Sequence, residues 1–75
     1  MASLKILDVG DNRIRRLEGL DGLSQLSELY CAKNKLTKIE GIGKLKKLYL
    51  LALQANFIDR IEGLEELAGL TELYL

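Results

Sequence analysis

The stretch Leu26–Leu36, LSELYCAKNKL, decides the fold, because its pattern occurs three times in this chain. The same apolar and asparagine positions return in Leu4–Ile14, LKILDVGDNRI, and in Leu48–Ile58, LYLLALQANFI. Each copy begins 22 residues after the previous one, and each has an asparagine at its ninth position. A fixed period of this length indicates a repeat protein, in which one small structural unit is stacked several times.

The second half of each repeat is also periodic. After the asparagine, apolar residues fall at every third position, as in Ile14, Leu17, Leu20 and Leu23, and a Glu-Gly pair recurs once in each repeat. The period places the whole chain, residues 1–75, in a single domain. Its repeats are residues 4–25, 26–47 and 48–69, followed by a partial repeat at 70–75.

The alternation of apolar and variable residues at the start of each repeat is typical of a short strand with one buried face. The spacing of three after the asparagine favours a return segment of short helical turns. One such unit cannot bury its apolar face alone, so stacked units must share one core and one parallel sheet. The pattern predicts strands near residues 6–8, 28–30, 50–52 and 72–74, and helical returns near 20–25, 42–47 and 64–69.

The pattern Leu-x-x-Leu-x-Leu-x-x-Asn-x-Ile/Leu, which closes in Ile-Glu-Gly-Leu at Ile61–Leu64, resembles the leucine-rich repeat. Its length resembles the 22-residue subclass typified by the nuclear regulatory subunit of protein phosphatase one. The resemblance covers Leu4–Leu75 and implies an α/β fold. The expected architecture is a right-handed solenoid fragment of about three and a half repeats, with a short parallel sheet on its concave face. We expect this fragment to lack the capping segments usual in the family.

The composition excludes several classes of function. The 75 residues carry eleven Lys plus Arg and eleven Asp plus Glu, so no net charge attracts the chain to nucleic acid or to an anionic membrane. With no His and one Cys, we expect no enzyme activity, no catalytic residues, no cofactor and no metal. No apolar run approaches the roughly 18 residues of a membrane span, and the N-terminus does not resemble a secretory signal. We therefore expect an intracellular protein, cytoplasmic or nuclear, that binds neither nucleic acid nor membrane.

The residues predicted to carry function point away from the core, onto the concave face of the sheet. Tyrosines are common at interface hot spots because they join a large apolar ring to a hydrogen-bonding hydroxyl. Alternatively, the rings pack on neighbouring strands and only stabilise the sheet. Phe57 stands in a column of charged residues and is expected at the rim. The predicted partner-binding residues are Ile6, Asp8, Glu28, Tyr30, Leu50, Ala52, Gln54, Glu72 and Tyr74.

The asparagine column, Asn12, Asn34 and Asn56, is predicted to be structural. Backbone groups in the turn after each strand have no ladder partners, and a buried amide side chain can satisfy them.

Two functions remain open at this point. By resemblance, the first is a non-catalytic module that binds a protein partner through its concave face, in the manner of a phosphatase regulatory scaffold. The second is a self-associating structural fragment, or a designed module, that forms homo-oligomers through its terminal strand edges. The charge distribution favours head-to-tail contact in the second case, because residues 26–47 carry a net charge of +4 and residues 48–75 a net charge of −4.

Overall fold

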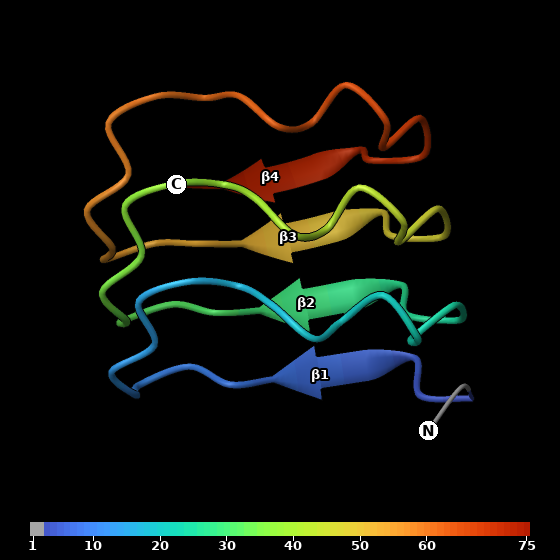
Figure 1. The fold of residues 1–75 in the computed structure, drawn as a ribbon, viewed down its shortest axis with the longest axis horizontal. Coiled ribbons are helices and arrows are strands. Elements are labelled where there is room, and N and C mark those ends of the chain that lie inside the picture. The colour runs from blue at the N-terminus through green and yellow to red at the C-terminus, as the bar shows by residue number, and fades with distance from the viewer. Residues whose placement is uncertain (1–2) are drawn as a thin grey trace.

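The computed structural model of the chain describes residues 3–75, which wind into a stack with one parallel sheet (Figure 1). Residues 1 and 2, which the predicted domain includes, lie outside the described residues. The strands are the four that the sequence predicts: β1 (Ile6–Asp8), β2 (Glu28–Tyr30), β3 (Leu50–Ala52) and β4 (Glu72–Tyr74).

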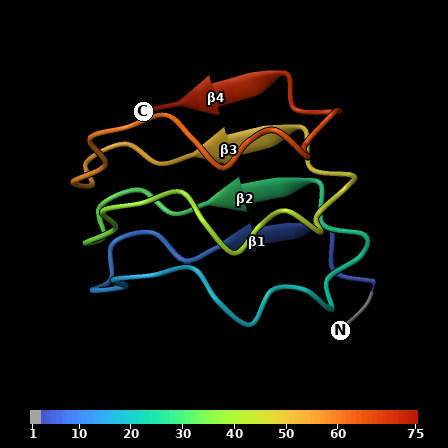
Figure 2. The same cartoon turned by 45° about the horizontal axis from the view of Figure 1, so that its top comes forward.

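The strands pair in chain order, each with the strand of the next repeat. Leu7 pairs with Leu29, Leu29 with Leu51, and Leu51 with Leu73, so the register equals the repeat length. Each column of the sequence therefore becomes a line of side chains across the sheet. Figure 2 shows the return segments running back beside the sheet, against the direction of the strands, so each repeat forms one turn of a solenoid.

The return segments contain successive tight turns, and the prediction of short helices near 20–25, 42–47 and 64–69 was wrong. In the first return, Leu23 N donates to Leu20 O at 3.0 Å and Leu26 N donates to Leu23 O at 3.1 Å. The same pair of bonds recurs in the other two returns. Apolar residues at every third position suit these turns, because each turn spans three residues and returns the next apolar side chain to the core. No continuous helix is needed. Within residues 3–75, no helix has the length and hydrophobicity needed to cross a membrane.

One hydrophobic core fills the space between the sheet and the return segments. It is most complete in the middle of the stack, where Leu29 and Leu51 have no exposed surface, while the equivalent residues of the outer strands are partly exposed. Burial thus depends on the neighbouring repeats. In one column, Leu17 and Ile39 are buried by the repeat that follows each of them, whereas Ile61 is 66% exposed.

The glycine of each Glu-Gly pair has a positive φ, between 73° and 80°, which an L side chain rarely adopts. At Gly41 the chain also passes close to the preceding repeat, and a Cβ there would overlap the carbonyl oxygen of Leu17. Gly19 has the same backbone conformation but nothing within 4 Å of that position. The glycine therefore serves two purposes, the turn itself and the close approach of successive repeats.

These two glycines allow the cost of close approach to be separated from the cost of the turn. Replacing Gly19 by Ala should destabilise by about 1–2 kcal/mol, the cost of a left-handed conformation. Replacing Gly41 by Ala should cost at least about 1 kcal/mol more, because the two backbones must also move apart. Urea unfolding of both variants measures the difference. Equal losses of stability would show that the close approach is not a constraint.

Candidate functional site

The candidate site is the concave face, defined by the nine predicted partner-binding residues, which lie on or directly after the four strands. Ile6 is 54% exposed and Tyr74 is 44% exposed, so both present apolar surface to solvent. Leu50 and Ala52 lie on the same face but are only 9% and 5% exposed. All of β3 is therefore buried, in contrast to the alternating exposure expected of a strand with one solvent face.

Side chains from the neighbouring strands cover β3. Leu50 lies between Glu28 and Glu72 in the register, and Ala52 lies between Tyr30 and Tyr74. Both neighbours at each level have longer side chains than the residue between them. The sheet thus carries two Glu-x-Tyr strands, β2 and β4, on either side of a strand with small or aliphatic residues.

Each tyrosine on this face donates its hydroxyl to a glutamate. Tyr30 donates to Oε1 of Glu28, and Tyr74 donates to Oε1 of Glu72 at 2.8 Å. Tyr49, which immediately precedes β3, donates to Oε2 of Glu28 at 2.9 Å. Glu28 therefore holds two rings at once. Tyr49 belongs to this site although sequence reasoning did not select it.

A signal for Tyr49 was present in the sequence. Its column otherwise reads Lys5, Ser27 and Thr71, so one aromatic residue stands among polar ones beside the strand. The column precedes the strand, so an alternating pattern assigns it no defined face. Only the fold shows that its hydroxyl reaches the adjacent strand.

The glutamates keep the tyrosines protonated. Hydrogen bonding to Glu28 is the main reason that the pKa of Tyr30 rises from its ordinary 10.0 to about 12. The same glutamate raises the pKa of Tyr49, and Glu72 raises the pKa of Tyr74. In each case a phenolate beside a carboxylate would lose the hydrogen bond and add a like charge.

Replacing Glu28 by Gln should therefore lower the pKa of Tyr30 and of Tyr49, but leave that of Tyr74 nearly unchanged. Because a raised pKa favours the protonated folded state, the stabilisation by the Tyr30–Glu28 bond is complete below pH 10.0 and disappears as the pH rises through about 12. Site-resolved NMR titration of the tyrosine rings measures all three values. Replacing Glu72 by Gln is the reciprocal control. If this variant changed the pKa of Tyr30 as much as that of Tyr74, the pairing of each tyrosine with its own glutamate would be wrong.

Beside these residues the concave face is hollowed. The hollow on this face measures about 450 Å³ and is centred on β3. A separate hollow of about 380 Å³ lies away from this face. The hollow on the concave face is lined by Asp8, Tyr30, Ala32, Leu50, Ala52, Gln54 and Tyr74. Six of its seven lining residues belong to the predicted partner-binding set. Glu28, Glu72 and Ile6 lie nearby in the register but do not line it.

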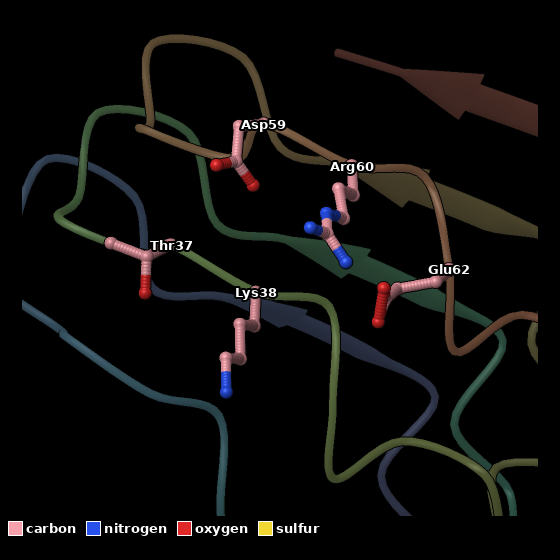
Figure 3. Close-up of a pocket in the computed structure, with 5 residues that line it drawn as sticks. All are labelled: Thr37, Lys38, Asp59, Arg60 and Glu62. Atoms are coloured by element: carbon pink, nitrogen blue, oxygen red, sulfur yellow. The ribbon is translucent and has the colours of Figure 1, made fainter.

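The hollow of about 380 Å³ lies between the return segments of the second and third repeats and is lined by charged and polar side chains (Figure 3). Lys38, Arg60 and Glu62 project there from neighbouring segments, and all three are exposed. The only ion pair among residues 3–75 lies elsewhere, between Lys46 and Glu66 at 3.9 Å, and is solvent-exposed. Exposed charges of this kind contribute little binding or stability by themselves.

The remaining predicted and reactive residues lie apart from the hollow on the concave face. Phe57 is 66% exposed, in the segment after the asparagine. Cys31 is fully buried in the core, and burial raises the pKa of its thiol to about 11, which keeps it protonated and unreactive. Among the described residues, no group of three or more potential ligands could hold a metal ion.

The asparagines connect successive repeats through their amides. Asn34, which is 4% exposed, accepts from Ile14 N at 3.0 Å and donates to Val9 O at 3.1 Å, both in the preceding repeat. It also donates to Cys31 O in its own repeat at 3.0 Å. Asn56 makes the equivalent bonds one repeat later, whereas Asn12 is exposed and bonds carbonyls of its own repeat.

Replacing Asn34 by Ala should therefore lower the free energy of unfolding by about 1–3 kcal/mol, because buried backbone groups lose their partners. Replacing Asn12 by Ala is the matched control and should cost less, since its bonds are exposed and local. Urea unfolding gives both values. A loss at Asn12 equal to that at Asn34 would mean that the bonds between repeats contribute nothing beyond the local turn.

The sequence matches the family of Leucine Rich repeats (2 copies) over residues 2–44 and again over residues 24–66. These matches span most of the chain, and the protein belongs to the leucine-rich-repeat family. Domains of this family generally mediate protein–protein interaction and are typically non-catalytic.

A crystal structure of an internalin from Listeria monocytogenes is similar to this fold, with a TM-score of 0.77 and 35% sequence identity. The similarity covers 93% of this chain but 21% of the internalin chain, so the two share a block of repeats and not a whole protein. No curated protein matches the sequence.

Proposed function

We propose that this chain is a non-catalytic module that binds a protein partner through its concave face. The observation that carries the proposal is that Tyr30 and Tyr74, each held in place by a glutamate, line a hollow of about 450 Å³. Rings that are already held in one orientation lose little conformational freedom when a partner covers them. This reduces the entropic cost of binding at the residues that interfaces use most.

The exposed fractions of the side chains also favour the concave face as the binding surface. Ile6 and Tyr74 lie at its two edges, each about half exposed, and they frame a buried apolar floor. The alternative, that the tyrosines only stabilise the sheet, accounts for the burial of Leu50 and Ala52. It does not account for the exposed surface of Tyr74 or for the hollow between the rings. The tyrosines therefore serve the sheet and remain available to a partner.

The finer proposal concerns the partner class. The 22-residue repeat with its Ile-Glu-Gly-Leu closing favours the subclass of phosphatase regulators, so a phosphatase catalytic subunit is the first partner to test. An intracellular location belongs to the same proposal. Self-association through the terminal strand edges is the competing function, supported by the opposite charges of residues 26–47 and 48–75.

The test compares two isoleucines of similar exposure. Ile6 on the concave face is 54% exposed, and Ile61 on a return segment is 66% exposed. Combining Ile6→Ser with Tyr74→Ala should weaken binding of a purified partner by roughly tenfold or more, the effect typical of a hot-spot residue. Ile61→Ser should leave binding unchanged. Biolayer interferometry with a phosphatase catalytic subunit measures both.

Sedimentation velocity over a wide concentration range tests the competing function on the same proteins. A monomer at all concentrations, together with loss of binding in the concave-face variant alone, supports the proposal. A concentration-dependent oligomer, with partner binding that neither variant changes, would instead assign the function to the stack ends. Binding to proteins other than the phosphatase that shows the same variant pattern would retain the module and reject the finer partner class.

A further inference from the structure

The side of the stack that follows the carboxyl ends of the strands, at the left of Figure 1, is strongly basic. Six of the eleven Lys and Arg residues lie in two segments, residues 11–16 and 33–38, together called the basic side. The only carboxylate in these segments is Asp11, which leaves a net charge of +5. The six cationic residues, all exposed, are Arg13, Arg15, Arg16, Lys33, Lys35 and Lys38.

The backbone holds these two segments side by side. Lys35 N donates to Ile14 O at 2.8 Å, which joins the second repeat to the first. Arg13 and Lys35 occupy one column of the stack. Arg16 and Lys38 occupy another, so like charges follow one another at the spacing of the repeats, about 4.8 Å. The backbone therefore cannot move apart to relieve the repulsion between these cations.

The chain itself does not neutralise the basic side. Among residues 3–75, the single ion pair joins Lys46 to Glu66 on the return segments, so none of the six cations has an ionic partner. Most of the opposite charge lies further along the stack, in residues 48–75, whose net charge is −4. A chain with no net charge overall thus presents one side with a concentrated positive charge.

One exposed aromatic ring borders the basic side. Phe57 stands in the column of Lys35, one repeat later, and is 66% exposed. Its N–H donates to Leu36 O at 2.8 Å, so its segment lies directly beside residues 33–38. Residues 55–60 have no net charge. The basic side therefore spans two repeats and ends at an apolar ring.

We propose that the basic side binds a short acidic segment of the partner protein. This inference rests on the proposed binding function and gives the same partner a second contact surface, beyond the ends of the strands that form the concave face. One exposed ion pair contributes little, but six cations on one side attract and orient an anionic segment together. The carboxylates of that segment also offset the repulsion between the stacked cations.

A nucleic acid is the other polyanion that a basic surface can bind, and it fits less well. Proteins that bind single strands combine a basic groove with several rings on which bases stack. Here one ring stands at the border, and residues 11–16 and 33–38 contain none. A strand that continued past these two repeats would meet the net negative charge of residues 48–75. An acidic peptide segment can end within the two repeats.

The test uses capped tetraglutamate peptide as the probe, with amide NMR spectra of the full chain. Saturable shifts should appear in residues 11–16 and 33–38. Tetraglutamine, which has the same length and no charge, should bind at least about fivefold more weakly. Raising the salt concentration to a near-physiological level should weaken tetraglutamate, because salt screens exposed charges.

Two double variants with the same change of net charge locate the binding. Arg16→Gln with Lys38→Gln removes one column of the basic side and should weaken tetraglutamate roughly threefold or more. Lys44→Gln with Lys47→Gln removes two exposed cations from the return segment of the second repeat and should leave its affinity nearly unchanged. The NMR spectrum of each variant also shows directly whether it remains folded.

Several outcomes would overturn the inference. These are equal weakening by the two double variants, equal binding of tetraglutamate and tetraglutamine, shifts confined to residues 44–47, or no binding of either peptide. Tighter binding of a short thymidine oligonucleotide with the same number of charges would assign the basic side to nucleic acid instead.

The proposed function is judged separately, by the effect of Ile6→Ser with Tyr74→Ala on the whole partner protein. That variant leaves the basic side intact and should bind tetraglutamate as the unmodified chain does. Loss of the partner in this variant, without tetraglutamate binding at the basic side, would retain the concave face as the binding surface and reject the second contact.

Discussion

The structure depends on one constraint: no repeat of this chain can bury its apolar face by itself. Each strand has three residues, and each return segment is a series of tight turns, so neither forms a core alone. Stacking in a register equal to the repeat length places leucine on leucine and buries both. The rest of the molecule must therefore allow neighbouring repeats to pack in direct contact.

Two features allow successive repeats to pack closely, one in the turn after each strand and one in the return segments. The asparagine amide bonds backbone groups in its own repeat and in the preceding one, which prevents unpaired polar groups in the turns. The glycine at Gly41 lets the return segments approach without a Cβ between them. The asparagine hydrogen bonds thus link successive repeats, and the glycine leaves room for them to approach.

The same register determines what the outer face can do. It aligns two Glu-x-Tyr strands on either side of β3, where the side chains are an aliphatic leucine and a small alanine. The result is a face with held aromatic rings, an apolar floor and carboxylates without basic neighbours. A chain with these residues in another register would have scattered them over the surface.

The strands could be predicted from the sequence because a repeat shows its own boundaries three times, and errors in one copy are corrected by the others. The conformation of the return segments could not be predicted, because a spacing of three fits both a short helix and a series of single turns. Only the hydrogen bonds of Leu20, Leu23 and Leu26 distinguish the two. The burial of Leu50 and Ala52 was also missed, since alternation describes one strand and the covering rings come from two others.

The sequence by itself determined the family, the repeat boundaries, the four strands and the set of side chains on the concave face. These follow from periodicity, which is a property of neighbours along the chain. The tertiary structure alone decided that Glu28 holds both Tyr30 and Tyr49, that Leu50 and Ala52 are buried on the concave face, and that Asn34 bridges two repeats while Asn12 does not. The bonds of Tyr49 and Asn34 join residues about one repeat apart, so their geometry exists only when the stack is formed.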